Sequence, residues 1–483
     1  MNFKVISRNV GKALLVNALF MFLSVLMSIY DGFDEGFGPL SISFVITAIV
    51  GFFPFIFARA IPATKLKEGF VIIILSWLLS FIVGMLPYIL YGGEFTIVNA
   101  WFESVSGYTT TGSTILTDIE SLPRSLLMWR SSTHYIGGLG VVVFLLLIFP
   151  ESNPFKGRLS NLEIASMSKT GYMYKAGKIV KVMLSVYVGL TIAETLLLWS
   201  AGMTLFDAVN HSFSTVATGG FSTKNDSIMH FDSTVIDVII TVFMILSAMH
   251  YGVIFSIVIK RSLKPLNGSI TRYYLALAAV LSLVVMLVLK VQGGYDSWGR
   301  ALHDSSFQVA SYISTTGFGQ ADNSTWPFLA NMFLLYAAFH CGCSGSTTGG
   351  VKADRMLLAY KAINSEFRRR RHPSSMFRTR LDGNIVKNET LSSVFLYIVV
   401  YVFVLMLSFL IVLSSGLDIS DAFSGTLASM SNVGKGIGNL GTMGNYSALP
   451  AAVKCVFTLD MFLGRVEIFP LLAVISMLFS REK

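Results

Sequence analysis

Apolar runs long enough to cross a lipid bilayer recur along the whole chain, and no other feature of the sequence constrains its fold as strongly. The chain has 483 residues, a mean hydropathy of +0.67 and only 13% charged residues. A helix of about 20 apolar residues spans the hydrocarbon core of a membrane, where backbone groups find no water to bond. The sequence therefore predicts an all-α integral membrane protein.

Ten such runs are candidate spans. They are Leu14–Tyr30, Ser41–Phe57, Phe70–Tyr91, Tyr135–Phe149, Ile179–Trp199, Val235–Ile259, Tyr274–Val291, a segment that begins at Trp326, Leu391–Leu413 and Ala451–Phe479. The first run is followed by no small-residue cleavage site, so we interpret it as a helix and not as a signal peptide.

Basic residues gather on alternate connections between these runs. If the N-terminus lies inside the cell, most of the 36 lysines and arginines fall on cytoplasmic segments, whereas the outward segments 31–35 and 226–237 are acidic. This is the asymmetry that the positive-inside rule describes. It predicts that both termini are cytoplasmic, and it explains the net charge of +9 without nucleic-acid binding.

One segment recurs four times on the outward side. The copies are Glu103–Ser113, Asn210–Gly220, Gln308–Phe318 and Gly425–Lys435, and each contains a Thr-Gly or Val-Gly pair that ends at Gly112, Gly219, Gly317 or Gly434. The intervals leave room for two spans and a cytoplasmic loop. A helix-capping residue precedes each glycine by twelve or thirteen positions, at Asn99, Asp207, Asp304 and Asp421.

Each repeated segment predicts a short helix that enters the membrane and turns back. About eleven residues make a helix of roughly 16 Å, which is half a bilayer. Irregular backbone at that depth is tolerated where it lines an aqueous pathway, so four such turns imply one shared axis. Glycine lets carbonyl oxygens point at that axis, and rings of carbonyls replace the hydration shell of potassium. The alternative is that each Thr-Gly pair serves close helix packing.

The sequence resembles the Trk/Ktr/HKT superfamily of potassium transporters, and most closely its bacterial TrkH branch. Besides the four glycines, the resemblance lies in Trp129–Gly140, His340–Lys352 and Gly464–Phe469. It implies four membrane-pore-membrane repeats with re-entrant pore helices in a pseudo-fourfold arrangement, preceded by two extra transmembrane helices. We therefore expect the extra helices in residues 1–68 and the repeats in 69–155, 156–265, 266–385 and 386–483.

The resemblance also implies the residues of a selectivity filter. They are Thr110, Thr111, Gly112, Ala217, Thr218, Gly219, Gly220, Thr315, Thr316, Gly317, Phe318, Asn432, Val433 and Gly434, with potassium bound at Thr111, Thr218, Thr316 and Val433. In the plant branch of the superfamily a serine at the first glycine position goes with sodium preference, so Gly112 favours potassium. Lys435 places a positive charge near the outer mouth, which departs from a uniformly cation-attracting entrance.

A glycine-rich stretch, Gly342–Gly350, has a composition that breaks a helix in mid-membrane. The resemblance implies a gate beneath the filter, formed by Gly342, Ser344, Gly345, Gly349, Gly350 and Lys352 with Arg465, which projects into the pore. The alternatives are an ordinary turn or close packing of small residues for the glycine-rich stretch and, for Arg465, a structural pair with Glu467, Asp460 or helix-end carbonyls. Glu194, alone in an apolar run, is either a coupling carboxylate or a hydrogen-bonded helix contact.

The resemblance implies potassium uptake across the bacterial inner membrane, with no enzymatic activity and no cofactor. The implied partners are potassium, membrane lipid, a second copy of the chain and a cytoplasmic nucleotide-binding ring of the TrkA kind. A sodium- or proton-coupled symporter stays open as the alternative. Remoter interpretations are an intramembrane serine protease that uses Ser344 with His250 or His134, and a metal site in His340–Cys343.

Overall fold

The computed structural model describes residues 2–57, 66–148, 176–372, 374 and 377–468. Within these ranges the regular structure is helical except for one short antiparallel hairpin of β1 (Arg380–Leu381) and β2 (Asn384–Ile385). Six of the described helices are long and apolar enough to cross a membrane, and one bent pair makes a seventh span. The predicted all-α membrane fold is therefore confirmed.

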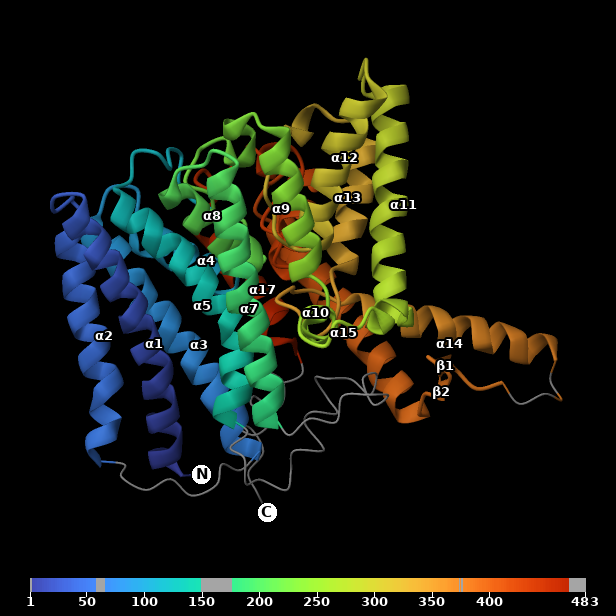
Figure 1. Ribbon diagram of the computed structural model, residues 1–483, viewed down its shortest axis with the longest axis horizontal. Helices are drawn as coiled ribbons and strands as arrows, with labels where there is room; N and C mark the ends of the chain where they lie inside the picture. Colours follow the sequence, from blue (N-terminus) through green and yellow to red (C-terminus); the bar gives the residue numbers. More distant parts are fainter. Residues whose placement is uncertain (1, 58–65, 149–175, 373, 375–376, 469–483) are drawn as a thin grey trace.

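Two N-terminal helices, α1 (Phe3–Tyr30) and α2 (Phe37–Phe57), lie side by side at one edge of the bundle (Figure 1). They pack on each other and on the next helix, α3 (Leu66–Tyr91). Many of their outward side chains are large and apolar, including Ile49, Phe52 and Ile56, each more than half exposed. Such a surface suits contact with lipid and not with water.

Four units follow, each with a long first helix, a short helix and an inner segment. The first helices are α3, α7 (Ala176–Ser200), α11 (Ser269–Gln292) and α15 (Asn388–Leu413). The short ones, here called pore helices, are α4 (Ile97–Tyr108), α8 (Leu205–Val216), α12 (Trp298–Ile313) and α16 (Ile419–Met430). The inner segments are α5 (Arg124–Ile148), α9 (Thr234–Ser247) with α10 (Tyr251–Val258), α13 (Phe328–His340) with α14 (Ala353–Arg371), and α17 (Ala451–Val466). Single 3-10 turns occur at η1 (Ser227–Phe231), η2 (Lys264–Asn267), η3 (Asn323–Thr325) and η4 (Gly438–Leu440).

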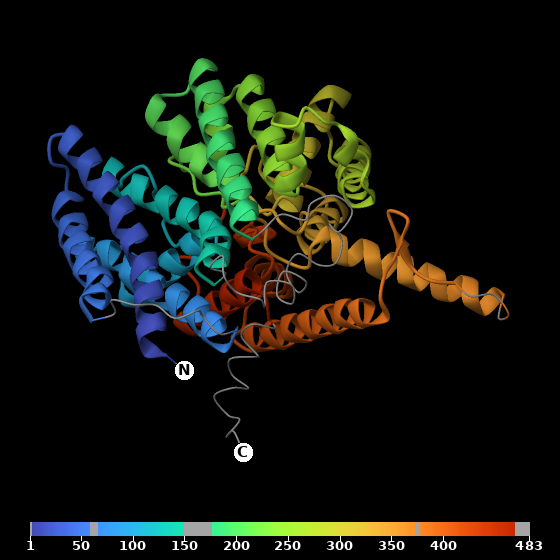
Figure 2. The ribbon, with the colours of Figure 1, turned by 60° about the horizontal axis from the view of Figure 1, so that its bottom comes forward.

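The units follow one another around a circle, as the sequence of colours in Figure 2 shows. Helix α5 of the first unit contacts α8 of the second, α9 contacts α12, and α13 contacts α16. The circle closes because α17 of the fourth unit contacts α4 of the first. The residue boundaries that we expect between the repeats stay predictions.

One predicted span is wrong as a single helix. The run Val235–Ile259 forms α9 and α10, which are bent by 112° at the break between them. The break receives the glycine-rich stretch of the third unit, because the Cys343 N–H donates to the Ala248 carbonyl at 2.8 Å. Hydropathy does not reveal this break, since both halves of the run are apolar. The spans predicted at Tyr135–Phe149 and Ala451–Phe479 extend beyond the described residues.

The predicted caps of the pore helices are also wrong. The helices begin earlier, and their N-caps are Thr96, Thr204, Ser297 and Asp418 instead of Asn99, Asp207, Asp304 and Asp421. Thr204 shows the reason, because its hydroxyl oxygen accepts from the Asp207 N–H at 3.1 Å and its hydroxyl group donates to the Asp207 carboxylate at 2.7 Å. This reciprocal arrangement places the acidic residue at the third helical position.

Candidate functional site

Each pore helix ends in a turn with the same unusual backbone. Residues with side chains adopt a positive φ at Thr110, Thr218, Thr315 and Asn432, and glycines do so two positions later at Gly112, Gly220, Gly317 and Gly434. The left-handed conformation costs a residue with a Cβ roughly 1–2 kcal/mol. Such strain persists where the surrounding structure imposes it and gathers at functional sites. The four turns are therefore copies of one element, here called the filter loops.

In the second filter loop, Gly220 and not Gly219 corresponds to the glycines of the other loops. In each loop the residue before this glycine donates its backbone N–H to the carbonyl of the residue five positions earlier in the chain. The Thr111 N–H donates to the Ser106 carbonyl at 2.9 Å, and the Gly219 N–H donates to the Ser214 carbonyl at 2.8 Å. Gly219 is therefore the counterpart of Thr111. The Thr-Gly pair by which we aligned this loop is one position out of register, because two glycines follow each other there.

The four filter loops meet in a closed ring within one chain. A methyl group added to Gly112 would collide with the carbonyl oxygen of Gly219 in the second loop. A methyl group at Gly220 would likewise collide with the Thr316 carbonyl oxygen. One at Gly317 would collide with the carbonyl oxygen of Val433, and one at Gly434 with that of Thr111. Each loop thus packs a glycine directly on a carbonyl of the next, and the fourth loop returns to the first. The loops therefore converge, as the repeats predict.

The ring assigns each expected filter residue to a level. Thr111, Gly219, Thr316 and Val433 form one level, so Gly219 stands where we expected Thr218. Thr110, Thr218, Thr315 and Asn432 form the level before it, and Ala217 is the C-cap of α8. Phe318 follows Gly317 and packs against the His211 ring at a centroid distance of 5.8 Å. The named side chains are fully buried.

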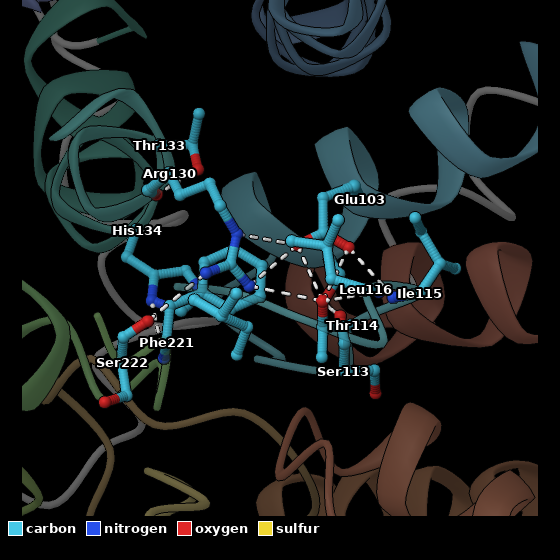
Figure 3. Close-up of polar contacts among 12 residues, drawn as sticks. Glu103, Ser113, Thr114, Ile115, Leu116, Arg130, Thr133, His134, Phe221 and Ser222 are labelled. Carbon is cyan, nitrogen blue, oxygen red and sulfur yellow. Dashed lines mark hydrogen bonds and ion pairs between the residues drawn. The ribbon is translucent and has the colours of Figure 1, made fainter. Parts of the chain in front are cut away.

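Behind the first filter loop lies an ion pair that the sequence analysis missed (Figure 3). Arg130 of α5 and Glu103 of α4 approach to 2.8 Å, and their side chains are 1% and 0% exposed. Glu103 also accepts from the Thr114 hydroxyl at 3.0 Å and the Ile115 N–H at 3.1 Å. The Arg130 guanidinium lies 4.0 Å from the centre of the Phe221 ring. The pair therefore joins a pore helix to two filter loops.

The other units place uncharged groups at the position of Glu103. Nine residues before the filter glycine stand Glu103, His211, Gln308 and Gly425. His211 Nε2 and the Ser222 hydroxyl lie 2.9 Å apart, and Gln308 Nε2 donates to the Ala321 carbonyl at 3.0 Å. The sequence contains this signal in either register of the second loop, because Asn210 and His211 are both non-acidic and Glu103 is the one acidic residue among the four positions.

The glycine-rich loop, defined here as residues 341–352 between α13 and α14, lies against the inner side of the filter loops. The Thr347 hydroxyl donates to the Val216 carbonyl at 3.1 Å, at the end of the second pore helix. The Gly349 N–H donates to the Thr315 hydroxyl at 3.4 Å, and a methyl group at Gly349 would collide with the Asn432 side chain. The loop thus contacts three of the four units at once.

Two cations bond to carbonyl oxygens of this loop, the buried Arg465 from α17 and the partly buried Lys352, which is the last residue of the loop itself. Arg465 Nη1 donates to the Thr347 carbonyl, and Arg465 Nη2 donates to the Gly137 carbonyl of α5 at 3.0 Å. Lys352 Nζ donates to the Thr348 carbonyl at 2.7 Å. Arg465 therefore fastens the glycine-rich loop to the inner helix of the first unit.

The carboxylates considered as partners for Arg465 are engaged elsewhere. Glu467 pairs with Arg355 at 2.7 Å, and Asp460 accepts from the Ser408 hydroxyl at 2.7 Å. Helix α17 ends at Val466, and Glu467 follows it with a φ of 64°, where its carboxylate pairs with Arg355 and not with Arg465. The interpretation of Arg465 as an ion-pair member is therefore wrong for both carboxylates.

The remaining residues of the predicted gate shape the loop itself. Gly345 and Gly350 adopt φ of 78° and 66°, and side chains there would collide with His250 and Cys341. Gly342 packs on the Ala248 carbonyl at the α9–α10 break. The Ser344 N–H and hydroxyl donate to the two carboxylate oxygens of Asp354 at 2.9 and 2.7 Å.

A family model described as a cation transport protein, TrkH, matches residues 41–483. The chain belongs to the TrkH family. It is 36% identical to the Trk system potassium uptake protein TrkH of Salmonella typhimurium and 35% identical to that of Escherichia coli, over 80% of each chain. The crystal structure of the potassium transporter TrkH from Vibrio parahaemolyticus superposes with a TM-score of 0.88 at 29% identity, covering 100% of this chain and 99% of that one.

Membership of the TrkH family identifies a multi-pass cation transporter and not an enzyme. The geometry also argues against a serine protease that uses Ser344 and His250. The Ser344 hydroxyl donates to Asp354, and His250 Nδ1 accepts from the Gly252 N–H. For the metal site, the described residues contain no group of three histidine, cysteine, aspartate or glutamate side chains that could hold an ion.

Proposed function

We propose that this chain takes up potassium ions through the ring of four filter loops. One observation carries the proposal: each filter glycine packs on a backbone carbonyl of the next loop until the circle closes. Carbonyl oxygens replace the water around a weakly hydrated cation, and four equivalent loops supply them around one path. The relatives from Salmonella typhimurium and Escherichia coli are named potassium uptake proteins, which supports potassium as the ion.

In this proposal the carbonyls of Thr111, Gly219, Thr316 and Val433 form one ring of potassium ligands, and the preceding residues of each loop form the next. The pore helices end at these loops, so the negative ends of four helix dipoles face the ion. The buried pair of Glu103 and Arg130 carries no net charge and fixes the outer limb of the first loop.

The glycine-rich loop acts as the gate in this proposal. Its contacts with Val216, Thr315 and Asn432 lie on the inner side of the filter loops, where a closed segment blocks the ion. Arg465 keeps the loop closed through the Thr347 carbonyl and adds a positive charge to a narrow passage. At 4 Å, two like charges repel by about 4 kcal/mol at an effective dielectric constant of 20.

The proposed setting is the bacterial inner membrane, with both termini in the cytoplasm, as a homodimer controlled by a cytoplasmic nucleotide-binding ring. Helix α14 supports a cytoplasmic contact, since it projects away from the bundle and ends in Arg368–Arg371 (Figures 1 and 2). Four exposed arginines at a helix end suit an acidic protein surface or anionic lipid headgroups.

Electrical recording from the purified chain in lipid bilayers tests the proposal. We expect a reversal potential that follows the potassium gradient and is unchanged when a sodium or proton gradient is added. A reversal potential that moves with either added gradient would instead support the coupled symporter. Gly112→Ser should lower the preference for potassium over sodium, because its side chain meets the Gly219 carbonyl. Gly189→Ser in α7, where nothing lies within 4 Å, is the control.

A further inference from the structure

Glu194 of α7 is a carboxylic acid buried in the membrane domain with no charged partner among the described residues. Its side chain is 0% exposed, and among the described residues neither carboxylate oxygen has a hydrogen-bonding partner. The helix around it is apolar and long enough to span the membrane. An unpaired carboxylate in such a place costs several kcal/mol or more, so the neutral acid is the form that the surroundings accommodate.

The group that faces Glu194 suits a protonated acid. It is the Thr215 hydroxyl, in the last turn of the second pore helix. That hydroxyl donates its own hydrogen to the His211 carbonyl at 2.8 Å. Its oxygen is therefore free to accept, which a carboxylic acid proton satisfies and a carboxylate does not. One hydroxyl and one carboxyl group are too few oxygens to hold a metal cation.

The helices packed around Glu194 supply no compensating charge. Helix α7 packs on α5, α8, α9 and α10. Their titratable groups bond elsewhere: Arg124 with Asp31, Arg130 with Glu103, His134 with Ser214, Tyr135 with Thr191, Asp207 with Thr223, His211 with Ser222, Asp237 with His303, and Tyr251 with the Val216 carbonyl. No ion pair in the described part of the chain includes Glu194.

We propose that Glu194 is a proton-binding site whose occupancy controls the second filter loop and its contact with the glycine-rich loop. Thr215 directly precedes Val216, which the glycine-rich loop contacts, and is three residues before Thr218 of the filter turn. Its carbonyl accepts from the Thr218 N–H at 2.9 Å, inside the filter turn. The next carbonyl, that of Val216, accepts from Thr347 of the glycine-rich loop. Release of the proton to water leaves a negative charge beside Thr215, which disturbs the turn and lowers conduction.

Infrared spectroscopy of the full-length protein in lipid tests the site without any reference to transport. The parent should show a carboxylic acid band that disappears as the pH rises, and Glu194→Gln should lack that band. Asp460→Asn is the matched control, because Asp460 is a buried acid that accepts from Ser408, and its loss should leave the Glu194 band in place. Identical spectra of the parent and Glu194→Gln across the pH range would overturn the proposal.

The consequence for conduction rests on the proposed function and is measured separately, as potassium flux into liposomes. Flux of the parent should fall about tenfold for each pH unit above the pKa of Glu194, because the protonated fraction falls by that factor. Glu194→Gln should abolish this alkaline loss, and Glu194→Asp should retain it with a shifted midpoint. The same alkaline loss in the parent and in Glu194→Gln would refute the control of conduction. Absence of potassium flux in the parent would refute the proposed function, while the infrared result still decides the proton site.

Discussion

The filter loops and the glycine-rich loop touch each other, yet they are built in opposite ways. The filter is fourfold: each unit repeats the same positive φ, the same glycine and the same backbone hydrogen bond. The glycine-rich loop occurs once. It is held by the side chains of Arg465 and Asp354 and by a bond from its own last residue, Lys352, and these have no counterparts in such a role in the other described units.

This difference follows from the roles that we propose for the two regions, a selectivity filter and a gate. A ring of carbonyls requires four equal distances to one ion, and backbone geometry with glycine packed on carbonyl leaves no room for adjustment. A gate has to leave its place, so it is held by a few polar contacts. A hydrogen bond to a charged group contributes about 1.5–3 kcal/mol, which a conformational change can offset.

The largest effect is expected from a methyl group in the ring. Gly220→Ala should abolish potassium flux, because alanine at a φ of 81° is strained and its Cβ would collide with the Thr316 carbonyl. Gly219→Ala should be milder, since the nearest atoms to its Cβ belong to the His134 side chain and not to a backbone carbonyl. Flux into liposomes measures both, with Gly189→Ala as the control. Greater damage from Gly219→Ala than from Gly220→Ala would contradict the register assigned here.

The second loop also shows how far the sequence alone leads. Apolar runs and the fourfold motif predict the membrane fold, the pore helices and the convergence of the loops, because these depend on backbone chemistry that glycine and hydropathy reveal. The register at Gly219 and Gly220 is not predictable, since either glycine satisfies the motif. Side-chain partners such as Glu103 with Arg130 depend on contacts between helices that are distant in the sequence.

The next effect concerns the charged support that only the first unit has. Glu103→Gln leaves Arg130 buried without its partner, which typically costs 3–5 kcal/mol. We expect a clear fall in the thermal unfolding temperature and a loss of potassium selectivity. Glu120→Gln is the control, because its pair with Lys224 at 4.0 Å is exposed and worth about 0–1 kcal/mol. Equal unfolding temperatures for the two variants would show that the buried pair does not stabilise the filter.

A smaller effect, of opposite sign, is expected at the gate. Arg465→Gln removes a charged donor from the Thr347 and Gly137 carbonyls and should raise potassium flux about tenfold, as expected for a loss of 1.5 kcal/mol or more. Deleting residues 346–348 should raise flux too, and both changes together should raise it by less than the product of the single rises, because Arg465 acts in part through Thr347. Additive effects in the double variant would mean that the charge and the loop are separate barriers.

The smallest effect is expected from the second tie of the loop. Lys352→Met keeps the apolar stem and removes only the ammonium bond to the Thr348 carbonyl, so flux should rise a few-fold, less than for Arg465→Gln. Lys361→Met is the control, because Lys361 is on the same helix and its 3.5 Å contact with Arg380 is exposed.

The double variant of Lys352→Met and Arg465→Gln decides whether the gate moves as one body. Thr347 and Thr348 are adjacent, and the Lys352 bond lies within the loop, so loss of that bond loosens the same turn that Arg465 holds from outside. In that case the combined rise in flux is smaller than the product of the single rises, and the coupling lies in the range of about 0.5–3 kcal/mol that neighbouring residues show. A combined rise equal to the product would mean that each cation restrains its own carbonyl. The filter loops would then differ from the glycine-rich loop in a further way, because the filter is one closed ring whereas the gate would consist of two independent contacts.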